Sequence, residues 1–147
     1  MDHDWLAKVW NDAWTEGLWA AAWSKSVEGL TARQAVWKPA PGRHSIWQIV
    51  THMIFWREDA LERLASGRGA LPKDEIERRN FPEPAQVSDA AWQATVARFG
   101  QSQERIAAAL ADPSKSLERL QYMLPHDSYH IGQINLIRAL QGHKPIE

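Results

Sequence analysis

Apolar side chains recur with the spacing of an α-helix in four long stretches of the chain. An amphipathic helix repeats its apolar positions every three or four residues. The segments at about residues 4–28, 45–67, 88–112 and 124–142 follow this spacing, and no segment alternates apolar and polar residues as a half-buried strand would. Four such helices in 147 residues predict an all-α fold, a four-helix bundle, as a single domain over residues 1–147.

Capping signals and helix breakers mark the ends of these segments. Thr31 and Ser45 each begin a capping box. They predict a short helical turn after Thr31 and a long helix from Ser45 to Gly67. Ser88 is a good N-cap for the third long helix. Pro125 suits the first helical position of the fourth, because its missing N–H would have no partner there.

Two connections separate the later helices. Residues 68–87 are rich in charge and proline and show little periodicity, so we expect a long connection there, too long for a tight hairpin. Twenty extended residues reach about 65 Å, enough to carry the chain along the full length of a bundle. Residues 116–123 are expected to form one more helical turn before the last helix.

Nine tryptophans is a high number for this chain. On a continuous first helix, Trp10 and Trp14 lie on one flank of the apolar stripe. The opposite flank carries Trp5, Trp19 and Trp23. One core does not cover both flanks, so one of them lines a pocket or meets another subunit, or else the tryptophans lie flat under connecting loops. We expect a homodimer.

Composition excludes several classes of function. Lysine and arginine total 17 and aspartate and glutamate 18, which gives no basic surplus for binding nucleic acid. The chain contains no cysteine, so disulfides, thiolate ligands and a cysteine nucleophile are excluded. The first residues do not resemble a signal peptide, and no apolar run is long enough to span a membrane. A soluble cytoplasmic protein is the expectation.

His126 and His130 are four residues apart in the last predicted helix. This spacing places two imidazoles on one helix face, where a first-row transition metal ion can accept both. The alternative is a pair of histidines that binds no metal. His52 lies among apolar neighbours in the second long helix and would face the pair. Three imidazoles from two helices would leave a coordination position free for water or substrate.

Two motifs resemble those of a known family. Residues 45–52, Ser-Ile-Trp-Gln-Ile-Val-Thr-His, followed by Trp56, resemble the second-helix motif of the DinB superfamily of metal-binding bundles. Residues 126–133, His-Asp-Ser-Tyr-His-Ile-Gly-Gln, resemble its fourth-helix motif. The order of the elements also agrees over nearly the whole chain.

This resemblance implies a histidine triad, carried here by His52, His126 and His130. It also implies long crossover connections in the bundle and frequent homodimers. Better-understood relatives are metal-dependent thiol transferases and isomerases that use bacillithiol or mycothiol, whereas other members have no known activity.

Several side chains near the triad are candidates to line a pocket or to hydrogen-bond to the ligands: Gln48, Trp56, Tyr129 and Gln133. For Gln133 we favour a hydrogen bond to another helix. Asp127 is expected to point away from His126 and to stabilise the helix dipole.

Two function classes remain open, and no catalytic residue is assigned. The first is a metal-dependent enzyme that acts on a small molecule by thiol transfer or hydrolysis. Zinc and nickel are the leading ions, since imidazole suits them better than calcium or magnesium. Thiol chemistry would need an external thiol, because the chain has no cysteine. The second class is a non-catalytic metal-binding or interaction bundle. Neither class needs nucleic acid or a membrane as a partner.

Overall fold

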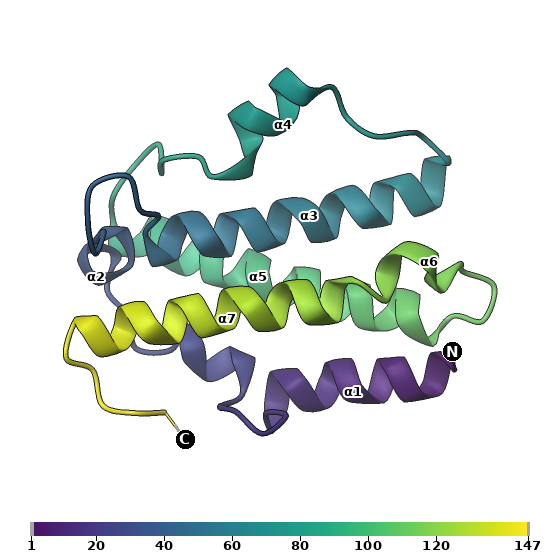
Figure 1. Ribbon diagram of the computed structural model, residues 1–147, viewed down its shortest axis with the longest axis horizontal. Helices are drawn as coiled ribbons and strands as arrows, with labels where there is room; N and C mark the ends of the chain where they lie inside the picture. Colours follow the sequence, from purple (N-terminus) through teal and green to yellow (C-terminus); the bar gives the residue numbers. More distant parts are fainter. Residues whose placement is uncertain (1, 147) are drawn as a thin grey trace.

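The computed structural model describes residues 2–146, which form helices and connecting segments without a strand. Four long helices lie side by side: α1 (His3–Thr15), α3 (Ile46–Ser66), α5 (Asp89–Ala111) and α7 (Met123–Leu140) (Figure 1). Shorter elements join them: η1 (Trp23–Ser26), α2 (Ala32–Val36), α4 (Lys73–Asn80) and α6 (Leu117–Leu120). The predicted all-α class is confirmed.

The long helices do not simply alternate in direction. Helices α3 and α5 run the same way, and α1 and α7 run the opposite way (Figure 1). Helix α5 packs against α1 and α3, and α7 packs against α3. Because α3 and α5 are parallel, the chain has to return between them. The segment between these helices does so along the outer side of α3 and carries α4 (Figure 1).

Helix α4 lies within the long connection predicted over residues 68–87. Its first turn carries Asp74 and Glu75, and its last turn carries Arg78 and Arg79. These charges complement the helix dipole at both ends, and Arg79 pairs with Glu75 at 2.8 Å. No residue of α4 is buried. Apolar periodicity gives no sign of this helix because it buries no side chain, whereas the placement of its charges favours it.

The predicted capping boxes are both present. Thr31 caps α2 and Ser45 caps α3, and in each case the side chains and backbone N–H groups bond reciprocally. Gly67 ends α3 in the left-handed conformation, with φ of +70°. Ser88 caps α5 as predicted. Helix α7 begins at Met123, so Pro125 is its third residue rather than its first.

The prediction of one helix over residues 4–28 is wrong. Helix α1 ends at Thr15, and Gly17 follows with φ of +81°. A Cβ atom at Gly17 would lie 1.8 Å from the carbonyl oxygen of Ala20, so the turn requires glycine. The Ser24 hydroxyl donates to the carbonyl of Trp14 and fixes the returning chain.

This break rearranges the tryptophans. Trp23 does not share a flank with Trp5, because it lies in η1 and packs edge-on against Trp10, with ring centroids 5.2 Å apart. Both rings are buried, whereas Trp5 is 54% exposed and Trp19 is fully exposed. The homodimer stays a prediction, and Trp5 and Trp19 are all that remain of the flank that suggested it.

The core fills the space between the long helices. Large, fully buried apolar side chains come from all four long helices, among them Trp10, Met53, Trp92, Phe99 and Ile134. Within residues 2–146, none of the helices has the length and apolar character required to cross a membrane. Helices α3 and α7 pack against each other at one side of this core, and they bring the predicted histidines together.

Candidate metal centre

Three histidines meet between α3 and α7. The Nε2 atom of His52 lies 3.2 Å from Nε2 of His126 and 2.9 Å from Nε2 of His130. One ring nitrogen of each of the three lies within 4.8 Å of the other two. His52 and His130 are buried, and His126 is partly buried. The structure therefore brings together the three histidines that the sequence singled out.

His52 is oriented by the side chain of Asn80, the last residue of α4. The Nδ1 atom of His52 lies 2.8 Å from Oδ1 of Asn80, and this oxygen also accepts a hydrogen bond of 2.9 Å from the Trp56 indole. An indole N–H can only donate, so the Asn80 atom is an acceptor. His52 must then donate through Nδ1, which leaves its Nε2 without a proton.

His126 is oriented by Asp127, and the prediction that this side chain points away is wrong. Oδ1 of Asp127 lies 2.7 Å from Nδ1 of His126, and Oδ2 accepts a bond of 2.7 Å from Nε of Arg57. The carboxylate has no exposed surface. Helical geometry separates the two Cβ directions by about 100°, but the short Asp127 side chain still reaches its neighbour's ring.

Arg57 reaches Asp127 from the centre of α3. Its side chain is fully buried, and its guanidinium carbon lies 5.0 Å from the centre of the Trp10 ring and 4.4 Å from that of Phe99. It also donates to the hydroxyl of Ser102 and to the Phe99 carbonyl. Aromatic faces and acceptors thus surround the charge. Burial lowers the pKa of Arg57, and Asp127 opposes that shift.

His130 is oriented by Gln133, one turn further along α7. Oε1 of Gln133 lies 2.7 Å from Nδ1 of His130, and its amide nitrogen donates to the Tyr129 hydroxyl at 3.1 Å. Gln133 therefore bonds within its own helix, and the expected bond to another helix is not found. Tyr129 is largely exposed and contacts the site through Gln133 and by an edge-on contact with the His130 ring.

These contacts assign the same tautomer to all three rings. Each Nδ1 faces an oxygen acceptor, so in the neutral form of each ring Nε2 carries a lone pair, and the three lone pairs converge. Burial lowers the pKa of His52 to about 4, with a further lowering from His130 and His126. Burial also lowers the pKa of His130. Converging lone pairs repel one another unless a cation lies among them, so this donor set fits a metal ion.

The spacing of the nitrogens agrees with metal coordination. Two ligand nitrogens at about 2.0–2.1 Å from a zinc ion are about 3.3 Å apart when the nitrogen–metal–nitrogen angle is tetrahedral. They are about 2.9 Å apart when that angle is a right angle. The two Nε2 distances from His52, 3.2 and 2.9 Å, match these values. Among residues 2–146, no aspartate, glutamate or further histidine completes the cluster.

Phe81 closes one side of the histidine cluster. Its ring stacks on His52 with centroids 4.0 Å apart and on His44 with centroids 3.8 Å apart, and all three planes are nearly parallel. Gln48 makes no hydrogen bond to the clustered histidines, but its amide donates to the Phe81 carbonyl at 3.0 Å. Gln48 thus anchors the connection that carries Phe81, while Trp56 acts through Asn80.

The remaining histidines lie outside the cluster. His3 bonds through Nδ1 to the carbonyl of Leu110, and His143 lies beyond the end of α7. His44 is separated from His52 by the Phe81 ring. Burial, with a smaller effect from Lys38, lowers the pKa of His44.

Sequence reasoning missed Asn80, Phe81 and Arg57. The first two lie at the end of α4, in a connection where no periodicity could place them. Arg57 did carry a signal, because it follows Met53 by one turn on the buried face of α3, where an unpaired arginine would be costly.

Comparison with known proteins agrees with the resemblance in the two histidine motifs. The family model described as the DinB superfamily matches residues 15–134, a segment that includes all three clustered histidines. No curated protein and no solved structure matched the chain. Because the matched segment covers well over half of the sequence, the chain belongs to the DinB superfamily.

Proposed function

We propose that His52, His126 and His130 hold one divalent transition metal ion through their Nε2 atoms. The observation that carries this proposal is the common tautomer, since three oxygen acceptors leave three lone pairs directed at one point. Hydrogen bonds of this kind orient metal-binding histidines and raise their basicity. Zinc and nickel are the favoured ions, because the donors are all imidazole nitrogens.

The site is best suited to catalysis on a small molecule. Three neutral ligands leave the charge of the ion uncompensated, and no fourth protein donor from residues 2–146 completes the cluster. A divalent ion with a free position supplies Lewis acidity that activates a water molecule or a thiol. The chain's own contribution is to fix the three imidazoles and, through burial, to lower the pKa of His52 and His130.

We therefore assign the protein as a metal-dependent enzyme of the thiol S-transferase or hydrolase type. A thiol substrate would be external, as the bacillithiol or mycothiol of the relatives is, because the chain has no cysteine. We propose as well that the chain forms a single four-helix bundle domain, in which residues 68–87 form the crossover. A homodimer is part of the same proposal.

Two assays on purified protein test the catalytic assignment. The protein is stripped with a chelator and reloaded with zinc or nickel. One assay measures conjugation of low-molecular-weight thiols to 1-chloro-2,4-dinitrobenzene, and the other measures hydrolysis of 4-nitrophenyl acetate. We expect one activity to require the ion and to disappear in His130→Ala, while His143→Ala retains it. If the loaded parent never exceeds His130→Ala in either assay, the protein is a non-catalytic metal-binding bundle.

A further inference from the structure

A pocket of about 400 Å³ lies beside the histidine cluster, between the α2–α3 connection and the C-terminal half of α7. This volume is in the range of small-molecule sites, about 300 to 1,000 Å³. Its walls are mostly apolar: Pro39, Ala40, Ile49, Leu136, Ile137 and Leu140. Leu136 is 61% exposed and Leu140 58%, so two large apolar side chains at this pocket face solvent. An apolar ligand would cover them.

The pocket carries one positive charge and no negative one. Arg43 lines it, and no ion pair of Arg43 occurs among the described residues. The other polar lining residues are Gln133, which carries no charge, and His44, which is neutral when its imidazole is unprotonated. Lys38, whose charge lowers the pKa of His44, does not line the pocket and is paired with Glu83. An anionic group on the ligand would therefore find a free partner in Arg43.

Two of the lining residues join this pocket to the histidine cluster. Gln133 accepts the hydrogen bond from Nδ1 of His130. His44 stacks on Phe81, whose ring also stacks on His52. A molecule in the pocket would thus contact groups that touch two of the three clustered histidines.

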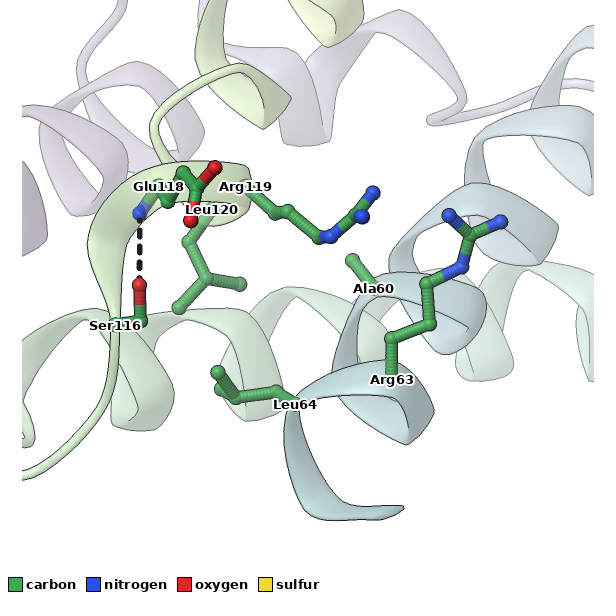
Figure 2. A pocket seen from close by; sticks show the side chains of 7 residues that line it. All are labelled: Ala60, Arg63, Leu64, Ser116, Glu118, Arg119 and Leu120. Carbon is green, nitrogen blue, oxygen red and sulfur yellow. Dashed lines mark hydrogen bonds between the residues drawn. The ribbon is translucent and has the colours of Figure 1, made fainter. Parts of the chain in front are cut away.

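A smaller hollow at the other end of α3 does not compete with this pocket. Figure 2 shows it between α3 and α6, where the side chains of Arg63 and Arg119 extend toward each other. Its volume is about 170 Å³, and Arg63 is already paired with Asp59 at 2.8 Å. None of its lining residues contacts the clustered histidines.

From this geometry we propose that the pocket binds small amphipathic anions, molecules with an apolar body and a carboxylate or similar group. The body lies against Ile49, Leu136 and Leu140, and the anionic group pairs with Arg43. This inference deepens the proposed function, because it names the class of molecule that the pocket would present to the histidines.

Isothermal titration of metal-free and zinc-loaded protein with hexanoate, octanoate and decanoate tests the inference. We expect the affinity to rise about three- to fourfold for each added methylene, as expected for burial of an apolar chain. 1-Octanol should bind more weakly than octanoate. In nuclear magnetic resonance spectra, octanoate should shift the signals of residues 39–44 and 133–140.

Matched variants separate the contributions of charge and apolar contact. Arg43→Gln should weaken octanoate binding about fivefold, as expected for an exposed charge pair, while Arg33→Gln, an exposed arginine on α2, should not. Leu136→Ala should weaken binding about three- to tenfold, while Val87→Ala, of similar exposure but outside the pocket, should not. Equal octanoate affinities in Arg43→Gln, Leu136→Ala and the parent would overturn the inference.

Two other outcomes also decide the question. If no carboxylate binds and Leu136→Asp converts a dimer to a monomer in sedimentation, the exposed leucines belong to an interface with a second copy and the inference fails. A failure of the metal proposal gives a different result. His130→Ala would then retain its metal, while octanoate binding would still be weakened by Arg43→Gln. Metal binding that depends on the histidines, without carboxylate binding, would contradict the pocket inference alone.

Discussion

Replacing Asp127 with asparagine should weaken metal binding and destabilise the fold together, because this carboxylate serves two buried partners. It accepts from Nδ1 of His126 and from Nε of Arg57, each at 2.7 Å. Asparagine keeps the volume but has one acceptor oxygen for two donors. One partner must then face an NH₂ group, and Arg57 becomes a buried charge without a carboxylate.

The expected magnitudes follow from these contacts. Removing one partner of a buried ion pair costs about 3 to 5 kcal/mol in free energy of unfolding. For a chain of this length, the midpoint of thermal unfolding should fall by about 10 °C. Loss of the group that orients a metal-binding histidine weakens metal affinity about 10- to 100-fold.

Two measurements keep the effects apart. Thermal unfolding in excess chelator reports the stability of the metal-free protein, and competition with a chromophoric zinc chelator reports metal affinity. Asp59→Asn is the matched control, because Asp59 is also buried and pairs with Arg63 and Arg68, but it contacts none of the clustered histidines. This control should lose stability and keep its zinc affinity.

A double variant tests the reasoning further. Replacing the pair with apolar residues, as in Arg57→Met with Asp127→Leu, removes the uncompensated charge and should recover much of the stability. Its zinc affinity should stay low, because nothing then orients His126. If Asp127→Asn binds zinc as tightly as the parent, the carboxylate does not orient the histidine and the reasoning is refuted.

Three further outcomes are expected. Zinc at 100 times its dissociation constant should stabilise the parent by about 2.7 kcal/mol, and a thermal midpoint that zinc leaves unchanged would contradict this. In the folded metal-free protein the pKa of His52 is about 4, below the unfolded value of about 6.5. The unfolded state therefore binds more protons between these two values, and the free energy of unfolding should decrease as pH falls through this window. In urea titrations His52→Gln should show a shallower decrease. Gly17→Ala should lower the free energy of unfolding by more than about 2 kcal/mol, because residue 17 has a positive φ and a Cβ there would meet Ala20. In the control Gly69→Ala a Cβ meets open space, so the free energy of unfolding should fall by less than about 0.5 kcal/mol.

Local sequence patterns were enough to predict the capped helices and the histidine pair. Thr31, Ser45 and Ser88 act within one turn of themselves, so their roles can be predicted from adjacent residues. His126 and His130 share a face for the same reason. The break at Gly17 also had a local signal, but the apolar residues on both sides suggested a continuous helix.

The groups that orient the histidines depend on the tertiary fold. Asn80 reaches His52 only because the connection returns along α3, and no pattern near residue 80 indicates this. Arg57 and Asp127 are 70 residues apart in sequence. They pair because the packing of α3 against α7 buries both side chains at the same place. The pocket beside Gln133 combines a loop with a helix that is distant in sequence, so it too needed the structure.

Metal stoichiometry of histidine variants tests the central claim most directly. Each variant is purified, exposed to zinc, dialysed and analysed for metal per chain by plasma mass spectrometry. We expect about one ion per chain in the parent, His44→Ala and His143→Ala, because these two histidines lie outside the cluster. Metal should be largely lost from His52→Ala, His126→Ala and His130→Ala. If these three variants all retain the parent's metal content, the ion binds elsewhere and the proposed function fails.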